Sequence, residues 1–203
     1  MDSKNVFLRM KLEQDITQLN RYTYAEYRDM INTLLAEDKT TGDNHSEAML
    51  GHTTMNVARM NRLDKRATIN EDLADKIKSL PAQTWLVISE AWCGDAAQNL
   101  PWINKMAELN EGIELTIVLR DENSELIDQF LTNGGRSIPK VIALSPNNLI
   151  HHTWGPRPQY MQEKYTQLKE EGLDYADISK TIHTMYAKNK GEALHHEYLE
   201  LLG

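Results

Sequence analysis

The sequence of 203 residues contains a single cysteine, Cys93. One cysteine cannot form a disulfide within the chain, so a scaffold held together by internal disulfides is excluded. Any chemistry that Cys93 performs must therefore involve a partner molecule. A reducing compartment is consistent with this cysteine content.

Long apolar runs and an excess of basic charge are also missing. No stretch approaches the roughly 18 uninterrupted apolar residues of a membrane span. Met1–Asn5 lack the basic and apolar segments of a secretory signal, so we expect a soluble, cytoplasmic protein without membrane contacts. The formal net charge is −8, with basic residues dispersed among acidic ones. This argues against nucleic-acid binding, because phosphate contacts need clustered Lys and Arg.

The first 82 residues have the periodicity of helices. A capping box at Thr23–Glu26 begins one helix, whose apolar side chains repeat at helical spacing. A later helix begins at Asn70 and stops before Pro81. We therefore predict an N-terminal helical extension over residues 1–82 that packs on the core.

Residues 83–156 are expected to form that core. Their apolar side chains occur in short continuous runs, which is typical of strands buried on both faces. The runs lie at 85–88, 113–119, 141–144 and 149–154. The order β-α-β-α-β-β predicts a mixed sheet, in which crossovers make the first three strands parallel and a closing hairpin adds an antiparallel edge.

Residues 157–203 return to helical spacing and are expected to complete the same domain. The fold class is thus α/β, a mixed central sheet flanked by helices, with N- and C-terminal helical extensions. These flanks either cover the functional site or simply complete the core. The sequence leaves that choice open, together with the oligomeric state.

Cys93 follows the first predicted strand directly and opens a helix. In an open α/β sheet, ligands gather outside the carboxyl ends of the strands. The amides and dipole of a helix N-terminus stabilise a thiolate, which favours a nucleophile over an inert core cysteine. Asp95 adds a negative charge that opposes this effect, so the sequence does not decide the direction of the thiol's pKa shift.

The residues around Cys93 resemble the thioredoxin family. Trp92-Cys93-Gly94 matches the start of the thioredoxin Trp-Cys-Gly-Pro-Cys site, and Pro101 lies where that family keeps the proline of its active-site helix. Ser137-Ile138-Pro139 resembles the cis-proline loop beside the thiol, and Trp154-Gly155 the end of the last strand. The resemblance covers about residues 83–156. The sequence is similar to a bacterial branch of the family that has helical extensions.

The resemblance implies a thioredoxin-like fold in which Cys93 is the attacking thiol. It implies that the substrate is bound by Trp92, Gly94, Asp95, Ile138, Pro139 and Gly155. Three positions depart from the thioredoxin pattern: Asp95 replaces the proline of the motif, Ala96 replaces the second, resolving cysteine, and Val87 replaces the buried aspartate that assists it. Reduction by two thiols of the same chain is therefore impossible.

Two functions remain open. In the first, Cys93 is a single-thiol (monothiol) redox group that attacks a protein or low-molecular-weight disulfide, and an external thiol resolves the adduct. In the second, the protein is a non-catalytic binding or scaffold module whose cis-proline groove holds an extended peptide by backbone pairing. The retained motif favours the first function, and the lost thiol and acid favour the second. A hydrolase needs a histidine partner for Cys93 that the sequence does not reveal.

Other candidate residues carry weaker signals. The adjacent histidines at 151–152 and 195–196 point in different directions, so neither pair predicts a metal site, and we expect neither metal nor cofactor. The tyrosines at 22, 24 and 27 are interpreted as packing residues, and Gly134-Gly135 as a turn before Pro139. Arg136 and Arg157 flank the loops expected near Cys93. They are interpreted as surface charge, with a site for an anionic thiol such as glutathione as the alternative.

Overall fold

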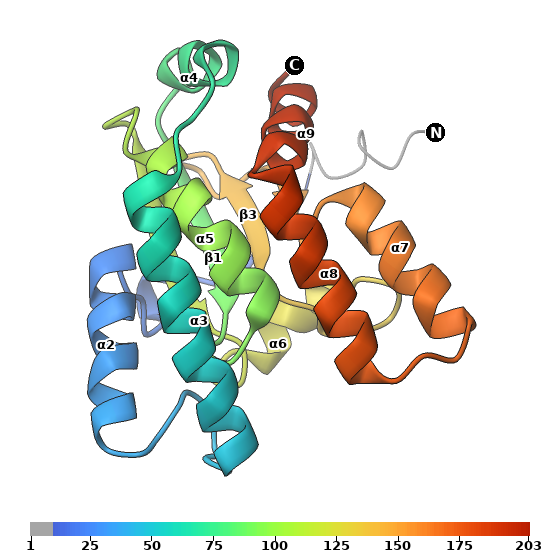
Figure 1. Cartoon of the computed structure of the whole chain (residues 1–203). Coiled ribbons are helices and arrows are strands. Elements are labelled where there is room, and N and C mark those ends of the chain that lie inside the picture. Colours follow the sequence, from blue (N-terminus) through green and yellow to red (C-terminus); the bar gives the residue numbers. More distant parts are fainter. Residues whose placement is uncertain (1–9) are drawn as a thin grey trace.

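The computed structural model describes residues 10–203, so Met1–Asn5, on which the expectation about a secretory signal rests, lie outside it. The elements in chain order are η1 (Ile16–Gln18), α2 (Tyr24–Ala36), α3 (Glu47–Arg66), α4 (Glu71–Lys78), β1 (Gln83–Ser89), α5 (Gly94–Ala107), β2 (Ile113–Leu119), α6 (Ser124–Ile127), η2 (Asp128–Phe130), β3 (Lys140–Leu144), β4 (Ile150–Trp154), α7 (Gln159–Glu170), α8 (Tyr175–Asn189) and α9 (Glu192–Leu202) (Figure 1). Within residues 10–203, no helix has the length and apolar character needed to span a membrane.

Local side-chain caps start two of the helices where the sequence predicts them. The Thr23 hydroxyl accepts from the Glu26 N–H and the Glu26 carboxylate accepts from the Thr23 N–H, which is the reciprocal capping box. Asn70 caps α4 by accepting from the Leu73 N–H at 2.9 Å. Both helices then contribute apolar side chains to the main core.

A sheet of four strands in the order β2-β1-β3-β4 forms the centre. β1 and β2 are parallel, β3 is antiparallel to β1, and β4 is antiparallel to β3. The mixed sheet is as predicted, but the prediction that the third strand runs parallel to the first is wrong. The helical turns α6 and η2 rise only about 10 Å, whereas a seven-residue strand such as β2 spans about 23 Å. β3 begins at Lys140, which pairs with Ile88 near the end of β1, so the chain re-enters the sheet at the same end at which β2 stops.

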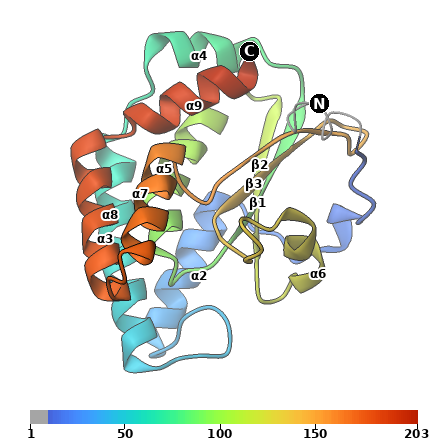
Figure 2. The same ribbon diagram turned by 90° about the vertical axis from the view of Figure 1, so that its right-hand side faces the viewer.

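Helices cover the two faces of this sheet unequally. Figure 2 shows α3, α5 and α8 on one side and α6 on the other. Every residue of β1 except Thr84 is buried, and so is every residue of β3. The N- and C-terminal helices contribute buried side chains to the same core, namely Tyr27, Ile31, Met60, Leu73, Ile77, Leu194 and Tyr198. Burying each of these contributes about 1.5–3 kcal/mol, so the extensions add substantially to the stability of the sheet.

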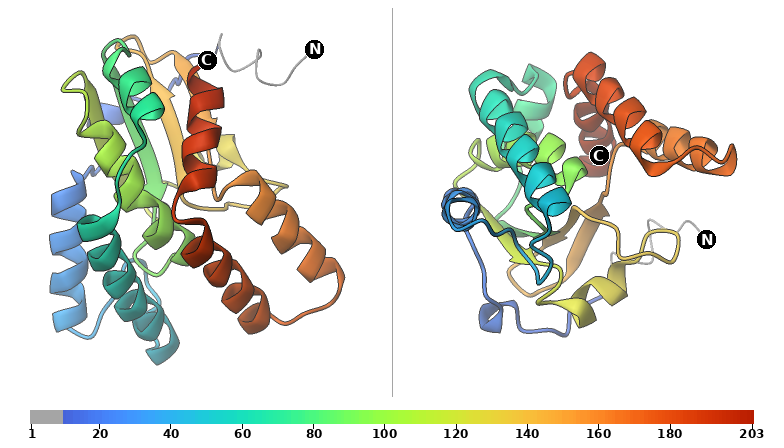
Figure 3. Two further views of the ribbon diagram at one scale, coloured as in Figure 1. Left: turned by 45° about the horizontal axis from the view of Figure 1, so that its top comes forward. Right: turned by 60° about the horizontal axis from the view of Figure 1, so that its bottom comes forward.

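Helices α7 and α8 form a hairpin with a small apolar cluster of its own. The cluster comprises Met161, Leu168, Ile178, Ile182 and Tyr186. Figure 3 shows this hairpin projecting past the sheet, whereas α9 turns back onto it. The first half of α8 lies at the end of the molecule where β1 passes into α5, and so it reaches the functional site.

Candidate functional site

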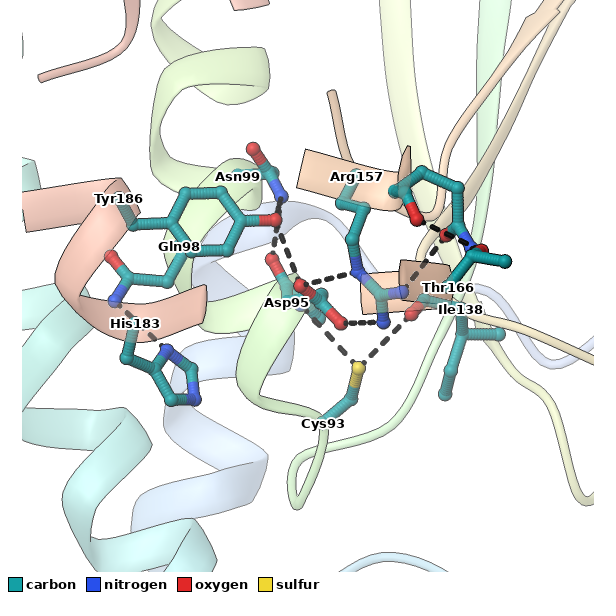
Figure 4. Close-up of polar contacts among 11 residues, drawn as sticks. Cys93, Asp95, Gln98, Asn99, Ile138, Arg157, Thr166, His183 and Tyr186 are labelled. Atoms are coloured by element: carbon teal, nitrogen blue, oxygen red, sulfur yellow. Dashed lines mark hydrogen bonds and ion pairs between the residues drawn. The ribbon is translucent and has the colours of Figure 1, made fainter. Parts of the chain in front are cut away.

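The Cys93 sulfur joins the start of α5 to the loop that precedes β3. Cys93 is the N-cap residue of α5, and its Sγ accepts from the Ala96 N–H at 3.4 Å. The same thiol donates to the Ile138 carbonyl oxygen at 3.2 Å (Figure 4). The Ile138–Pro139 peptide bond is cis. The residues that the sequence analysis named from two distant segments thus meet at one sulfur atom.

Burial dominates the electrostatics of this thiol. Cys93 is only 8% exposed. Desolvation raises its pKa to about 12 and the Asp95 charge pushes in the same direction, against the backbone N–H groups of Ala96 and Asp95 and the charge of Arg157. Cys93 is therefore a protonated thiol at neutral pH, which agrees with its donation to Ile138.

Asp95 is held by a network of largely buried polar groups. Arg157 binds its carboxylate through Nε at 3.1 Å and Nη2 at 2.5 Å, and the Tyr186 hydroxyl donates to it at 2.8 Å. Asn99 donates to both the Asp95 carbonyl and the Tyr186 hydroxyl, at 2.8 and 2.9 Å. Burial alone would lower the pKa of Arg157, but its bonds to Asp95 and the carboxylate charge raise that pKa overall. The Arg157 guanidinium thereby compensates the negative charge of the Asp95 carboxylate beside the thiol.

Helix α8 closes a small pocket over the thiol. The pocket has a volume of about 90 Å³ and is lined by Trp92, Cys93, Gly94, Asp95, Arg157, Tyr165, Tyr175, Ser179, Ile182 and His183. Gly94 makes this approach possible, because a Cβ at that position would lie 2.7 Å from His183 Nε2. The Gln98 amide contacts the other ring nitrogen of His183 at 3.3 Å. The C-terminal extension therefore covers the site as well as completing the core.

Gly155 brings the end of β4 against the loop that contacts the thiol. Its φ is +111°, and a Cβ there would lie 2.1 Å from the Pro139 carbonyl oxygen, so only glycine fits. The buried Lys140 ammonium donates to the Gly155 carbonyl at 3.2 Å and to the Thr132 hydroxyl at 2.8 Å. Burial lowers the pKa of Lys140 to about 8.

The structure brings together the predicted residues on both sides of the thiol and pairs both candidate arginines with carboxylates. Arg136 is surface charge as interpreted, but that interpretation is wrong for Arg157, which is largely buried and lines the pocket over the thiol. Arg157 is bound to Asp95, with its guanidinium 4.3 Å over the Tyr165 ring. Arg136 pairs with Asp128 at 2.6 Å on the surface. Neither guanidinium is available for an anionic thiol in this arrangement. Within residues 10–203, no group of three or more His, Cys, Asp or Glu could hold a metal ion.

Sequence reasoning missed two kinds of residue at the site. His183 and Tyr175 reach the pocket, and Tyr186 reaches Asp95, only because α8 docks there. The helical spacing of residues 157–203 gives no sign of these contacts. Glu90, three residues before the thiol, is fully buried and accepts from the Asp121 N–H at 2.9 Å. Burial raises the pKa of Glu90, and no local pattern marks a charged residue at the end of a strand as buried.

Comparisons with known proteins agree on the architecture. A family model described as Thioredoxin matches residues 42–169, more than half of the chain. A crystal structure of a protein of unknown function from Pseudomonas aeruginosa has a TM-score of 0.55 and 18% sequence identity, covering 89% of this chain and 97% of that one. The crystal structure of an HIV epitope-scaffold has a TM-score of 0.53 and 18% identity, covering 89% and 98%. Identities this low show the fold alone. No curated protein matches the chain significantly.

Proposed function

Since this chain belongs to the thioredoxin family, we propose that it is a single-thiol redox protein whose Cys93 reacts once α8 moves away from it. Within the family we assign it to the bacterial branch with a single-cysteine Trp-Cys-Gly-Asp-Ala site, acting in the cytoplasm. The observation that carries the proposal is the position of the sulfur. It lies at the N-terminus of α5, 3.4 Å from the Ala96 N–H and 3.2 Å from the Ile138 carbonyl.

The reaction needs an external thiol because no second cysteine exists. Cys93 loses its proton to water, and the thiolate attacks one sulfur of a partner disulfide, forming a mixed disulfide and releasing the other sulfur as a thiolate. A low-molecular-weight thiolate then attacks the partner's sulfur in that mixed disulfide and releases Cys93. The net change is a thiol–disulfide exchange in the partner: the low-molecular-weight thiol takes the place of the thiol that was released. The protein itself neither gains nor loses electrons.

Helix α8 controls the first step in this proposal. Displacing it exposes Sγ to water and reduces the desolvation by burial that is the largest cause of the raised pKa. The helix terminus and Arg157 then act on a solvated sulfur, and both favour the thiolate. A partner that inserts between α8 and the Pro139 loop thus prepares the thiol that it reacts with.

Glutathione disulfide tests the proposal. We expect it to add one glutathione to the natural protein at pH 9, slowly, and none to Cys93→Ser, by intact mass. Ile182→Ala loosens α8 and should accelerate the addition, whereas Ile77→Ala removes the same groups from the main core far from the thiol and should not. Absence of any adduct on the folded natural protein and on Ile182→Ala, while the unfolded protein reacts, contradicts the redox proposal.

A non-catalytic binding module is the second candidate, favoured by the burial and protonation of Cys93. In that case the thiol is a structural hydrogen-bond donor to Ile138. Extended peptides without cysteine should then bind Cys93→Ser as well as the natural protein, measured by calorimetry. Loss of peptide binding in Cys93→Ser contradicts this second candidate.

A further inference from the structure

A second cavity lies along α5, one helical turn and more beyond the thiol. Its volume is about 230 Å³. It is formed where α3, α5 and α8 come together with the start of α9, and Figure 1 shows α5 between α3 and α8. The redox proposal does not use this cavity.

The charge around this cavity is of one sign. Arg62, Arg66 and Lys190 line it, and among the described residues 10–203 no acidic side chain does, although the whole chain carries a net charge of −8. All three cations are exposed, and within residues 10–203 none of them forms a salt bridge. Unpaired cations gathered at one opening create a local positive potential that attracts an anion.

The inner surface combines a flat apolar wall with buried amides. Trp102 provides the wall, and Gly191, with a φ of +86°, lies so close to it that a Cβ there would be 2.8 Å from the ring. The side-chain amides of Gln98 and Asn99 lie deeper, at 5% and 1% exposure. A concave site with an apolar wall and few polar groups is the usual form of a small-molecule site.

We propose that this cavity binds a small organic anion that has a flat apolar group and a carboxylate or phosphate. The apolar group packs against Trp102, Leu63 and Leu194 in the lining, and the anionic group meets Arg62, Arg66 and Lys190 at the opening. Asn99 and Tyr186 line the cavity and also hold Asp95, so a ligand here adjoins the network beside Cys93 without touching the thiol.

Phenyl phosphate is a suitable probe, followed by calorimetry and tryptophan fluorescence. We expect saturable binding at one site with a dissociation constant near 1 mM or tighter, about −4 kcal/mol. Benzyl alcohol and inorganic phosphate, which each lack one half of the probe, should bind at least about tenfold more weakly. The double variant Arg62→Gln/Arg66→Gln should weaken phenyl phosphate binding about tenfold or more, and Ala187→Leu, which fills part of the cavity from an exposed helix position, should also weaken it.

A matched control separates this site from a general charge effect. Lys65→Gln/Lys188→Gln also removes two exposed positive charges, from α3 and α8, which both border the cavity, but at positions that do not line it. It should leave the affinity unchanged. Equal weakening by both double variants, or no saturable binding to the folded natural protein, overturns the proposal. Cys93→Ser should bind the probe normally, so failure of the redox proposal leaves this one standing.

Discussion

At the scale of single residues, Asp95 opposes the thiolate while Arg157 supports it. The carboxylate raises the pKa of Cys93 and the guanidinium lowers it. Replacing Asp95 by Asn removes the opposing charge and leaves the guanidinium without its partner. We therefore expect Asp95→Asn to lower the thiol pKa by about one unit and to accelerate alkylation by iodoacetamide at pH 8 about tenfold.

The alkylation rate should be measured across pH for the natural protein, for Asp95→Asn and for an exposed control, Asp75→Asn. The control should reproduce the natural curve, because the Asp75 side chain is 80% exposed and pairs with Lys78 rather than with a residue of the site. A natural rate curve with its midpoint below the free-thiol value near pH 8.5 would contradict the burial argument.

His183 makes stability depend on pH. Burial lowers its pKa to about 4, and the positive charge of Arg59 acts in the same direction. The unfolded chain therefore binds more protons between pH 6.5 and 4, and stability falls as the pH drops through that window. We expect His183→Gln to reduce the stability lost between pH 7 and 5 by about 1–2 kcal/mol in urea unfolding.

The control for this measurement is His196→Gln, whose side chain is 74% exposed. It should lose stability between pH 7 and 5 by the same amount as the natural protein. If His183→Gln also behaves like the natural protein, the imidazole is not buried in its neutral form.

At the scale of elements, the first turn of α5 preserves the spacing of a two-thiol site. Ala96 is buried, and its N–H points at Cys93 Sγ. We expect Ala96→Cys to close a disulfide with Cys93 on mild oxidation, seen as a mass loss of about two daltons and the loss of both free thiols. The variant should then reduce insulin disulfides measurably, whereas the natural protein should not, because nothing in it can displace a bound partner.

The activity of that variant should stay modest, because Val87 supplies no buried acid. Ala97→Cys is the matched control, since the next residue of the helix is rotated by about 100° and should not reach the sulfur. Insulin reduction by the natural protein at a rate similar to the variant would contradict the single-thiol account.

The α7–α8 hairpin should open more readily than the sheet. Its apolar cluster has five buried side chains, separate from the main core. Segments with few buried contacts exchange amide hydrogens through local opening of low free energy. We expect faster exchange in 161–186 than in β1 and β3, by mass spectrometry, and still faster exchange there in Ile182→Ala, which removes about 2–4 kcal/mol of packing. Equal protection of the hairpin and the sheet against hydrogen exchange would contradict local opening of the α7–α8 hairpin.

Local signals in the sequence predict the elements well. The capping residues Thr23 and Asn70 start their helices as expected, and the apolar run at 85–88 lies within β1 (Gln83–Ser89). These features depend on neighbours within one helical turn or on unbroken burial. The direction of β3 depends on how far α6 and η2 can carry the chain, and local periodicity does not measure that distance.

In the candidate site, too, the features that depend on short sequence strings were predictable and those that depend on long-range packing were not. The motif at Trp92–Asp95 and the loop at Ile138–Pro139 are recognisable from short strings, and the structure brings them into contact. The pairing of Asp95 with Arg157 joins residues 62 positions apart and depends on the docking of α7 and α8. The pKa of Cys93 could not be predicted for this reason, because desolvation by burial is the largest cause of its shift, and that burial depends on how distant segments pack around the thiol.

At the scale of the whole molecule, the two extensions have different roles. The N-terminal helices and α9 share the core of the sheet, so removing them exposes the apolar faces of β1 and β3. The α7–α8 hairpin instead carries its own cluster and the side chains above the thiol. The hairpin that we expect to open most readily thus lines the pocket over the Cys93 thiol.

The position of α8 over Cys93 also has a consequence for timing. A sulfur that reacts only after a helix moves cannot react faster than the helix opens, however concentrated the reagent. Two unrelated disulfides then reach the same maximal rate, and their chemistry sets only the concentration at which each reaches that plateau. The maximal reaction rate of such a protein is set by the packing of Ile178 and Ile182, which holds the helix in place, rather than by the nucleophilicity of its thiol.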